Sequence, residues 1–94
     1  MSVILVASMK VKDAEKLAKY RKAYGPMARA VGGELLAKGK KLADLAGSSA
    51  EGDLVAFRFP DEATFRTWWD SAEYKKLVPL RDEAAEGVFT LYEE

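Results

Sequence analysis

The sequence predicts an α+β protein: a four-stranded antiparallel sheet in β-α-β-β-α-β order, with its helices on one face. Three observations indicate this class. The 94 residues are enough for one small domain. Strand-like and helix-like apolar periods follow one another in that order along the chain. The first strand is apolar on both faces, which is typical of a central strand. We therefore expect residues 1–94 to form a single domain.

The first part of the chain predicts a strand and a helix. Residues 2–9 (SVILVASM) contain five consecutive apolar residues, which indicates a central strand. Asp13 is a candidate N-cap of a helix of about four turns. The apolar stripe of that helix recurs at spacings of three and four residues: Leu17, Tyr20, Tyr24, Met27 and Val31. Because proline inside a helix costs about 3 kcal/mol, we expect a kink or a break at Tyr24–Pro26. Gly32-Gly33 should end the helix.

The middle of the chain is less regular. Residues 34–38 (ELLAK) predict a short strand. Residues 40–52 leave two structures open. Leu42 and Leu45 fit an extension of that strand, whereas Gly47-Ser48-Ser49 is typical of a loop. The sheet extends further at this end if the strand extension forms, and stops sooner if the loop forms.

The third strand leads directly into a helix. Residues 53–59 (DLVAFRF) alternate between two faces, which predicts a strand that Pro60 ends. Asp61 is a candidate N-cap, and the apolar side of the helix after it carries three aromatic residues: Phe65, Trp68 and Trp69.

A second helical piece and a last strand complete the pattern. Asp70 and Ser71 are candidate caps at the start of the second piece. Pro79 should limit or kink this piece, and Gly87 should mark its end. Residues 88–92 (VFTLY) alternate again and predict the final strand.

This order of elements is that of the ferredoxin-like fold, in which right-handed crossovers bring the first and third strands to the middle of the sheet. We expect these two strands to be parallel and the helices to cover one face. The bare face would still carry apolar residues: Leu54, Ala56, Val88 and Tyr92. Monomers seldom expose so large an apolar patch. The sequence therefore predicts a homodimer packed sheet to sheet through this open face, with an interface above about 1,000 Å².

The composition argues against several classes of function. Fifteen basic and fifteen acidic residues cancel, so we expect neither nucleic acid nor a membrane as a partner. No apolar run approaches a membrane span or a secretory signal, which favours a cytoplasmic protein. The chain has no histidine and no cysteine, hence no histidine base, thiol nucleophile or His-ligated haem. Its acidic residues are not spaced along the chain as metal ligands would be, so we expect no metal and no cofactor.

Motifs spread over nearly the whole chain resemble one family. The most specific is Trp68-Trp69-Asp70-Ser71-Ala72-Glu73-Tyr74, which Leu80-Arg81 follows at a short distance. The other matching pieces are Tyr20-Arg21, Gly32-Gly33, Leu36, Lys38-Gly39 and Phe59-Pro60. In these residues the chain resembles the domain of unknown function 1330 family, small proteins of the dimeric α/β-barrel group. It departs from the family pattern at Lys38, Ala46 and Arg58, where members often have Arg, Glu and Glu.

The resemblance implies the ferredoxin-like fold and dimerisation, and it implies no established reaction. Structural relatives of that family include cofactor-independent monooxygenases, muconolactone-type isomerases and haem-degrading enzymes. The absence of histidine argues against the haem-degrading branch. Fold alone assigns none of these activities.

Arg58 is the main candidate for binding a charged ligand. It lies on the third strand, on the face opposite Phe57 and Phe59, which points it toward the dimer interface or a pocket there. A guanidinium in such a place needs a partner. Two partners fit: a carboxylate-bearing ligand held bidentately, or an acidic residue of the same or the other subunit.

Five other residues are candidates for ligand binding between the helices and the sheet: Tyr20, Tyr24, Trp68, Tyr74 and Arg81. For Tyr20 and Tyr24 core packing is the favoured interpretation, because both lie on the apolar stripe of the first helix, and a pocket beside them would let them bind a ligand. Adjacent tryptophans cannot both face fully inward, so one of Trp68 and Trp69 should be core and the other a pocket wall or a dimer contact. No catalytic residue stands out.

Two functions of different classes fit these residues. In the first, the dimer binds or converts a small apolar or aromatic acid without a metal. In the second, it is a non-catalytic dimeric structural or interaction module. A cavity of about 300 Å³ or more, with Arg58 or Arg81 unpaired at its wall, would favour the first. A filled interior with every arginine paired would favour the second.

Overall fold

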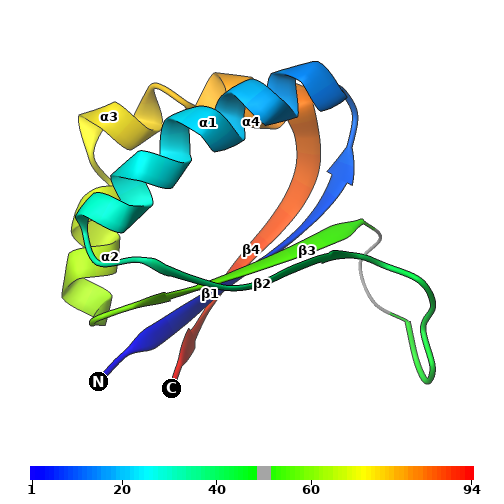
Figure 1. The fold of residues 1–94 in the computed structure, drawn as a ribbon, viewed down its shortest axis with the longest axis horizontal. Coiled ribbons are helices and arrows are strands. Elements are labelled where there is room, and N and C mark those ends of the chain that lie inside the picture. Colours follow the sequence, from blue (N-terminus) through cyan, green and yellow to red (C-terminus); the bar gives the residue numbers. More distant parts are fainter. Residues whose placement is uncertain (49–51) are drawn as a thin grey trace.

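The structure, a computed structural model, describes residues 1–48 and 52–94. Its elements are β1 (Val3–Val11), α1 (Ala14–Ala30), β2 (Glu34–Lys40), β3 (Asp53–Phe59), α2 (Glu62–Trp69), α3 (Ala72–Lys75), α4 (Val78–Ala84) and β4 (Ala85–Glu93). The four strands form one sheet, and the helices lie together on one of its faces (Figure 1). The predicted α+β class and order of elements are therefore confirmed, with the second helical segment in three short helices.

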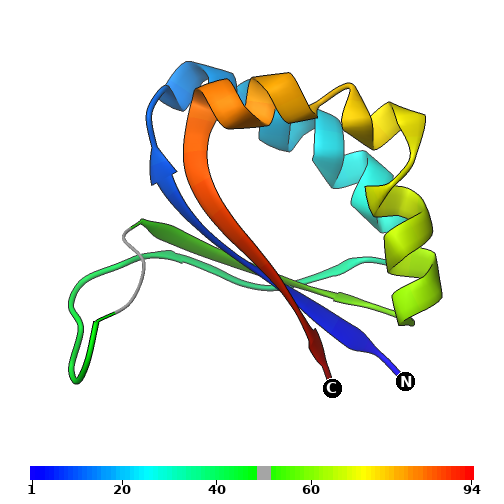
Figure 2. The ribbon, with the colours of Figure 1, turned by 180° about the vertical axis from the view of Figure 1, so that it is seen from behind.

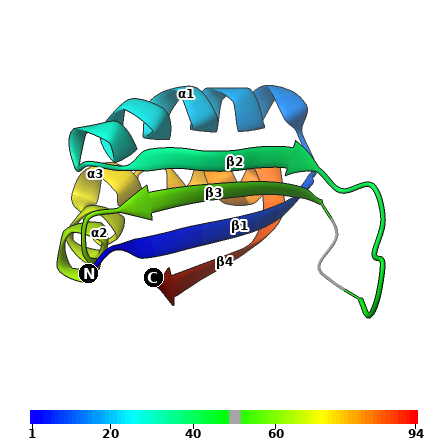
Figure 3. The same ribbon diagram turned by 60° about the horizontal axis from the view of Figure 1, so that its bottom comes forward.

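Strand β1 lies at the centre of the sheet. The strand order is β2-β3-β1-β4, so β1 pairs with both β3 and β4, as its uninterrupted apolar run predicts. All three pairings are antiparallel. The expectation that the first and third strands are parallel is therefore wrong. The helical crossover α1 makes β1 parallel to β2, and β3 runs between them in the opposite direction (Figure 3).

Helix α1 continues through Pro26, so the expected break is absent. Pro26 has no N–H to donate to the Lys22 carbonyl, but both residues are exposed and water can reach that carbonyl. Tyr24 and Ala28, on either side of the proline, are buried, and this packing outweighs the local penalty. Asp13 caps the start as predicted, accepting hydrogen bonds from the amides of Glu15 and Lys16.

Three predicted boundaries in the second half require correction. Ser71 caps α3, accepting a hydrogen bond from the Tyr74 amide, whereas Asp70 is the C-cap that follows α2 and does not cap the start of a helix. Pro79 lies in the first turn of α4, where its missing N–H has no intrahelical partner to lose. Gly87 lies inside β4 and not at the end of a helix.

The two faces of the sheet differ in what covers them. Val3, Leu5, Ala7 and Met9 of β1 face the helices and are buried, as are the alternate residues of β3. The open face carries the other set of each strand, including Ile4 and Val6 of β1, Leu54 and Ala56 of β3, and Val88 and Tyr92 of β4. Leu54, Val88 and Tyr92 are between 44% and 57% exposed. The predicted apolar open face is therefore present.

Residues 41–48, here called the arm, form neither helix nor strand. The arm continues past the end of β2 and turns away from the helices, toward the side of the open face (Figures 1 and 2). Of the two structures considered for this stretch, the loop is the one found, although Ser49 of the loop signal lies outside the described residues. In the described part of the chain, no helix is long and apolar enough to cross a membrane.

Candidate ligand-binding site between helix and sheet

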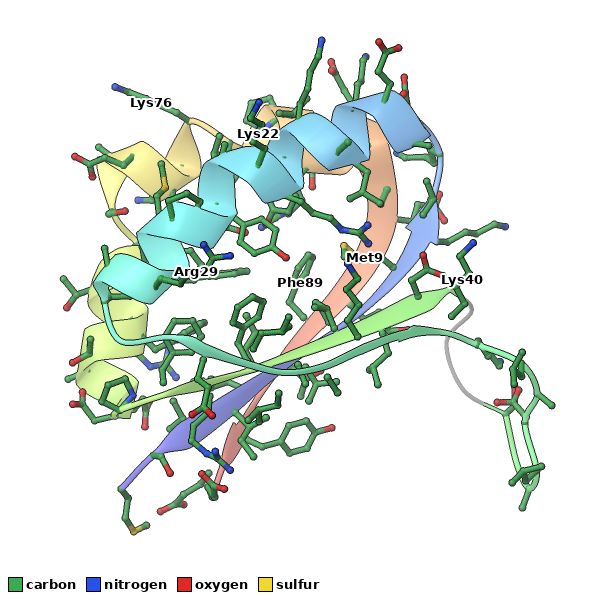
Figure 4. The ribbon with its side chains drawn as sticks, viewed as in Figure 1. Met9, Lys22, Arg29, Lys40, Lys76 and Phe89 are labelled. Carbon is green, nitrogen blue, oxygen red and sulfur yellow. The ribbon has the colours of Figure 1, made fainter. Side chains whose placement is uncertain are left out.

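A small cavity lies between the helices and the covered face of the sheet. Seven aromatic side chains contribute to its wall: Tyr20, Tyr24, Phe57, Phe59, Trp68, Trp69 and Phe89. Figure 4 shows Met9 and Phe89 pointing from β1 and β4 into this space. The cavity volume is about 20 Å³, which is room for a single water molecule. The cavity is therefore far below the size expected for a bound aromatic acid.

The two adjacent tryptophans divide their roles much as their spacing predicts. Trp68 is 6% exposed and stacks on Phe59, with ring centroids 5.5 Å apart, so it is core. Trp69 is half-buried, stacks on Tyr74 at 4.7 Å and lines the cavity. The indole Nε1 of Trp68 is buried and has no hydrogen-bond partner among the described residues. A buried donor without a partner favours a water or a ligand acceptor beside it.

A buried chain of polar atoms links Tyr20, Tyr74 and Arg81. The hydroxyls of Tyr20 and Tyr74 are 2.6 Å apart, and Nη1 of Arg81 donates to the Tyr74 hydroxyl at 3.1 Å. The guanidinium of Arg81 also lies over the rings of Phe89 and Trp69, 4.9 and 5.5 Å from their centroids. Burial, followed by the interaction with Tyr74, raises the pKa of Tyr20 far above its ordinary value. The Tyr20 phenol therefore stays protonated and can donate a hydrogen bond but cannot act as a base near neutral pH.

A groove at the edge of the domain adjoins this cavity. The side groove lies between α1 and the strands β2 and β3, and its volume is about 130 Å³. It shares Tyr24, Val55 and Phe57 with the wall of the inner cavity. Gly25 and Leu35 also line it, together with three cationic residues: Arg21, Arg29 and Lys38. The side groove is therefore apolar toward the cavity and cationic toward solvent.

The groups near Arg21, Arg29 and Lys38 determine where an anion would be favoured. Arg21, Arg29 and Lys38 make no ion pair with any residue in the ranges 1–48 and 52–94. Burial raises the pKa of Tyr24, while the nearby charge of Arg21 opposes that rise. A second hollow of about 180 Å³ is lined by Arg21, Lys38 and Lys40 and also by Asp53, whose carboxylate would repel an anion. The lining of the side groove contains no acidic side chain, so an anion is favoured there over the second hollow.

Sequence reasoning did not identify Arg21 and Arg29 as binding residues, although their spacing contains a signal. Arg21, Gly25 and Arg29 are four residues apart, so they form one stripe along α1 beside the apolar stripe. Gly25 has no side chain to fill the space between the two guanidiniums. Figure 4 shows Arg29 on the side of α1 that faces β2. Lys38 of β2 also lines this groove.

The structure places Arg58 away from the other candidates. It lies on the open face, where its Nε and Nη2 each donate to a carboxylate oxygen of Glu94 at 2.7 Å, and Glu34 lies 3.6 Å away. Hydrogen bonds from Arg58 and then from Ser2 lower the pKa of Glu94 to about 2. The ion-pair alternative for Arg58 is thus the arrangement found. The inner cavity brings together Tyr20, Tyr24 and Trp68, while Tyr74 and Arg81 join it through Tyr20.

The polar groups around the cavity and the side groove are phenols, indoles and cations. They can bind and orient an acidic or polar ligand. In the part of the chain described, no group of three or more acidic side chains could hold a metal ion.

The fold and this site define a small α+β domain with an aromatic-walled cavity between its helices and its sheet. The chain belongs to the family named domain of unknown function 1330 (DUF1330), whose model matches residues 2–94. The family that its motifs resemble is therefore confirmed. A search of curated proteins found no match.

Solved structures support the same fold at low sequence identity. A protein of unknown function from Rhodopseudomonas palustris is 18% identical, with a TM-score of 0.83 over 99% of this chain and 82% of that one. SnoaB, a cofactor-independent oxygenase from Streptomyces nogalater, is 12% identical, with a TM-score of 0.70 over 99% and 92%. A dimeric ferredoxin-like protein of unknown function from Thermobifida fusca is 17% identical, with a TM-score of 0.63 over 100% and 92%. The ferredoxin-like fold is therefore confirmed.

Proposed function

We propose that the protein binds a small apolar or aromatic carboxylic acid in the side groove, without a metal. One observation carries this proposal: three cations without ion-pair partners among the described residues line a groove that shares Tyr24, Val55 and Phe57 with an aromatic-walled cavity. Arginine forms paired hydrogen bonds with a carboxylate, so Arg21 and Arg29 would bind the charged end of the ligand. The apolar end would lie against Tyr24, Val55 and Phe57.

The wall of the inner cavity adds support for an aromatic ligand. The side groove and the cavity share residues of α1 and β3, so a ring in the groove would lie next to other rings. The Trp68 indole N–H, which has no partner among the described residues, is a donor for a ligand or a water. The small size of the inner cavity and the ion pairs of Arg58 with Glu94 and of Arg81 with Asp82 support the alternative, a non-catalytic dimeric structural or interaction module.

A carboxylate ligand is expected to raise the melting temperature, and its neutral analogue is not. Suitable pairs of probes are 4-phenylbutyrate with 4-phenylbutanamide and octanoate with octanamide. At 100 times its Kd, a ligand stabilises the folded state by about 2.7 kcal/mol. For a domain of this size, such a change raises Tm by about 10 °C or more. A thermal-shift series over ligand concentration measures the effect.

Matched variants show whether the side groove is responsible. The double variant R21Q/R29Q should lose the shift, whereas K19Q/K22Q removes two exposed charges from the same helix and should keep it (Lys22 is labelled in Figure 4). R58A should also keep it, because Arg58 lies on the open face. Equal shifts from acids and amides, or a full shift in R21Q/R29Q, would reject the carboxylate site. No shift with any probe would favour the non-catalytic module.

We also propose that the protein is a homodimer that packs through the open faces of two sheets. The support is the exposed apolar surface around Leu54, Val88 and Tyr92, together with the dimeric description of the Thermobifida fusca relative. The polar cluster of Arg58, Glu94 and Glu34 would lie at the rim of this contact. Sedimentation equilibrium at micromolar concentration should give twice the mass of one chain. A single-chain mass under those conditions would reject the dimer.

A further inference from the structure

The arm carries two leucines that contact almost nothing in their own chain. Leu42 is 99% exposed and Leu45 is 98% exposed, more than any other large apolar residue in the ranges 1–48 and 52–94. They lie three residues apart on a segment that extends away from the body of the domain (Figures 1 and 2). Single exposed leucines are common, but two fully exposed ones on a projecting segment favour a binding partner.

The area of the open face leaves room for a further contact in the dimer. Strands of up to nine residues are about 30 Å long, and four of them span about 19 Å. The flat outline of the face is thus at most about 600 Å² per copy, or about 1,200 Å² for the pair, near the low end of the range for stable specific interfaces. A contact from each arm would bring the interface into the usual range.

We infer that the arm of each protomer packs across the partner, burying Leu42 and Leu45 against the margin of the partner's open face. The inference rests on the proposed dimer and adds a second, exchanged contact to it. The arm turns toward the side on which the second copy would lie (Figures 1 and 2). In the two-fold dimer, both arms make the same contact, so four leucines leave water.

The margin of the open face is the apolar surface available to these leucines. Val88 and Tyr92, both exposed, lie on the edge strand β4, where the sheet-to-sheet contact would end. The outer side of α1 presents the charged residues Lys19 and Lys22, and Ala18 beside them is too small to cover a leucine. A second copy of this chain therefore fits the arm by its chemistry.

Replacing both leucines should weaken the dimer and leave the protomer folded. Because Leu42 and Leu45 are solvent-exposed within the chain, L42S/L45S should keep the far-ultraviolet circular dichroism of the parent. Its dimer Kd, from sedimentation equilibrium, should rise at least about a hundredfold, since four leucine side chains no longer leave water. The control A43S/A46S also replaces two arm residues with serine, but it removes little apolar area. Its dimer Kd should stay within about threefold of the parent value.

A thiol probe tests burial of the arm directly. The chain has no cysteine, so L45C and A18C each introduce a unique thiol, the second at an exposed position on α1. In the dimer, L45C should react with 5,5′-dithiobis(2-nitrobenzoic acid) at least about tenfold more slowly than A18C, and at the same rate after dilution to protomers.

The outcomes separate the arm contact from the dimer itself. A dimer whose Kd is unchanged in L42S/L45S, or whose L45C reacts as fast as A18C, overturns the arm contact and leaves the open-face dimer intact. A parent protein that sediments as a single chain overturns both. Loss of affinity in L42S/L45S together with slow modification of L45C establishes the exchanged arm.

Discussion

Replacing Trp68 with alanine is expected to lower the free energy of unfolding by about 3–5 kcal/mol, the range for removing a large buried aromatic side chain. Trp68 is buried and packs against the rings of Phe59, Phe65 and Tyr74, with centroids 5.5, 6.0 and 4.8 Å away. These rings come from β3, α2 and α3. Removing Trp68 therefore leaves a cavity where the sheet and two helices meet. Urea unfolding at one fixed protein concentration measures the loss.

The adjacent tryptophan is the matched control. Trp69 has the same side chain on the same helix but is only partly buried, so W69A should lose about half as much stability as W68A. Its indole covers Phe89 and Arg81 at the wall of the cavity. An equal or larger loss for W69A would contradict the division of roles between the two residues.

Patterns confined to one strand or one helix were enough to predict most of the fold. The run in residues 2–9 indicates a strand covered on both faces, and alternation in 53–59 separates the two faces of β3. Both are local patterns that burial along one element creates. The predicted break of the helix at Pro26 was wrong because the local pattern does not show packing between segments. Local propensity disfavours a helix there, but packing of Tyr24 and Ala28 against the sheet keeps it continuous.

The candidate site depends more on contacts between distant segments. The aromatic stripe of α1 and the motif around Trp68 could be recognised along the chain, and the structure brings both to one cavity. The partner of Arg58 could not be recognised along the chain, because Glu94 lies 36 residues away and meets Arg58 on the open face. The side groove also needs β2 beside α1 to bring Lys38 near Arg21. Spacing on α1 shows that Arg21 and Arg29 share a stripe, but not what the stripe faces.

Replacing Gly52 with alanine is expected to lower the free energy of unfolding by at least about 3 kcal/mol. Its φ of +119° is a conformation that residues with a side chain rarely adopt, and a Cβ there would lie 1.9 Å from the carbonyl oxygen of Met9. The obstacle is backbone of the central strand and cannot move aside as a flexible side chain would. Relief would require separating β3 from β1 at the Met9–Asp53 pair.

Gly39 is the control for this substitution, because it lies at the facing end of β2 and pairs with Leu54. A Cβ on Gly39 would meet no heavy atom within 4 Å, so G39A should change stability by less than about 0.5 kcal/mol. Urea unfolding of the two variants at equal concentration gives the comparison. Similar stabilities for G52A and G39A would mean that the chain can enter β3 by another backbone path.

Gly52 fixes where the chain enters β3 beside Met9. G52A should therefore also disturb the end of the sheet from which the arm extends, and so weaken the dimer more than G39A.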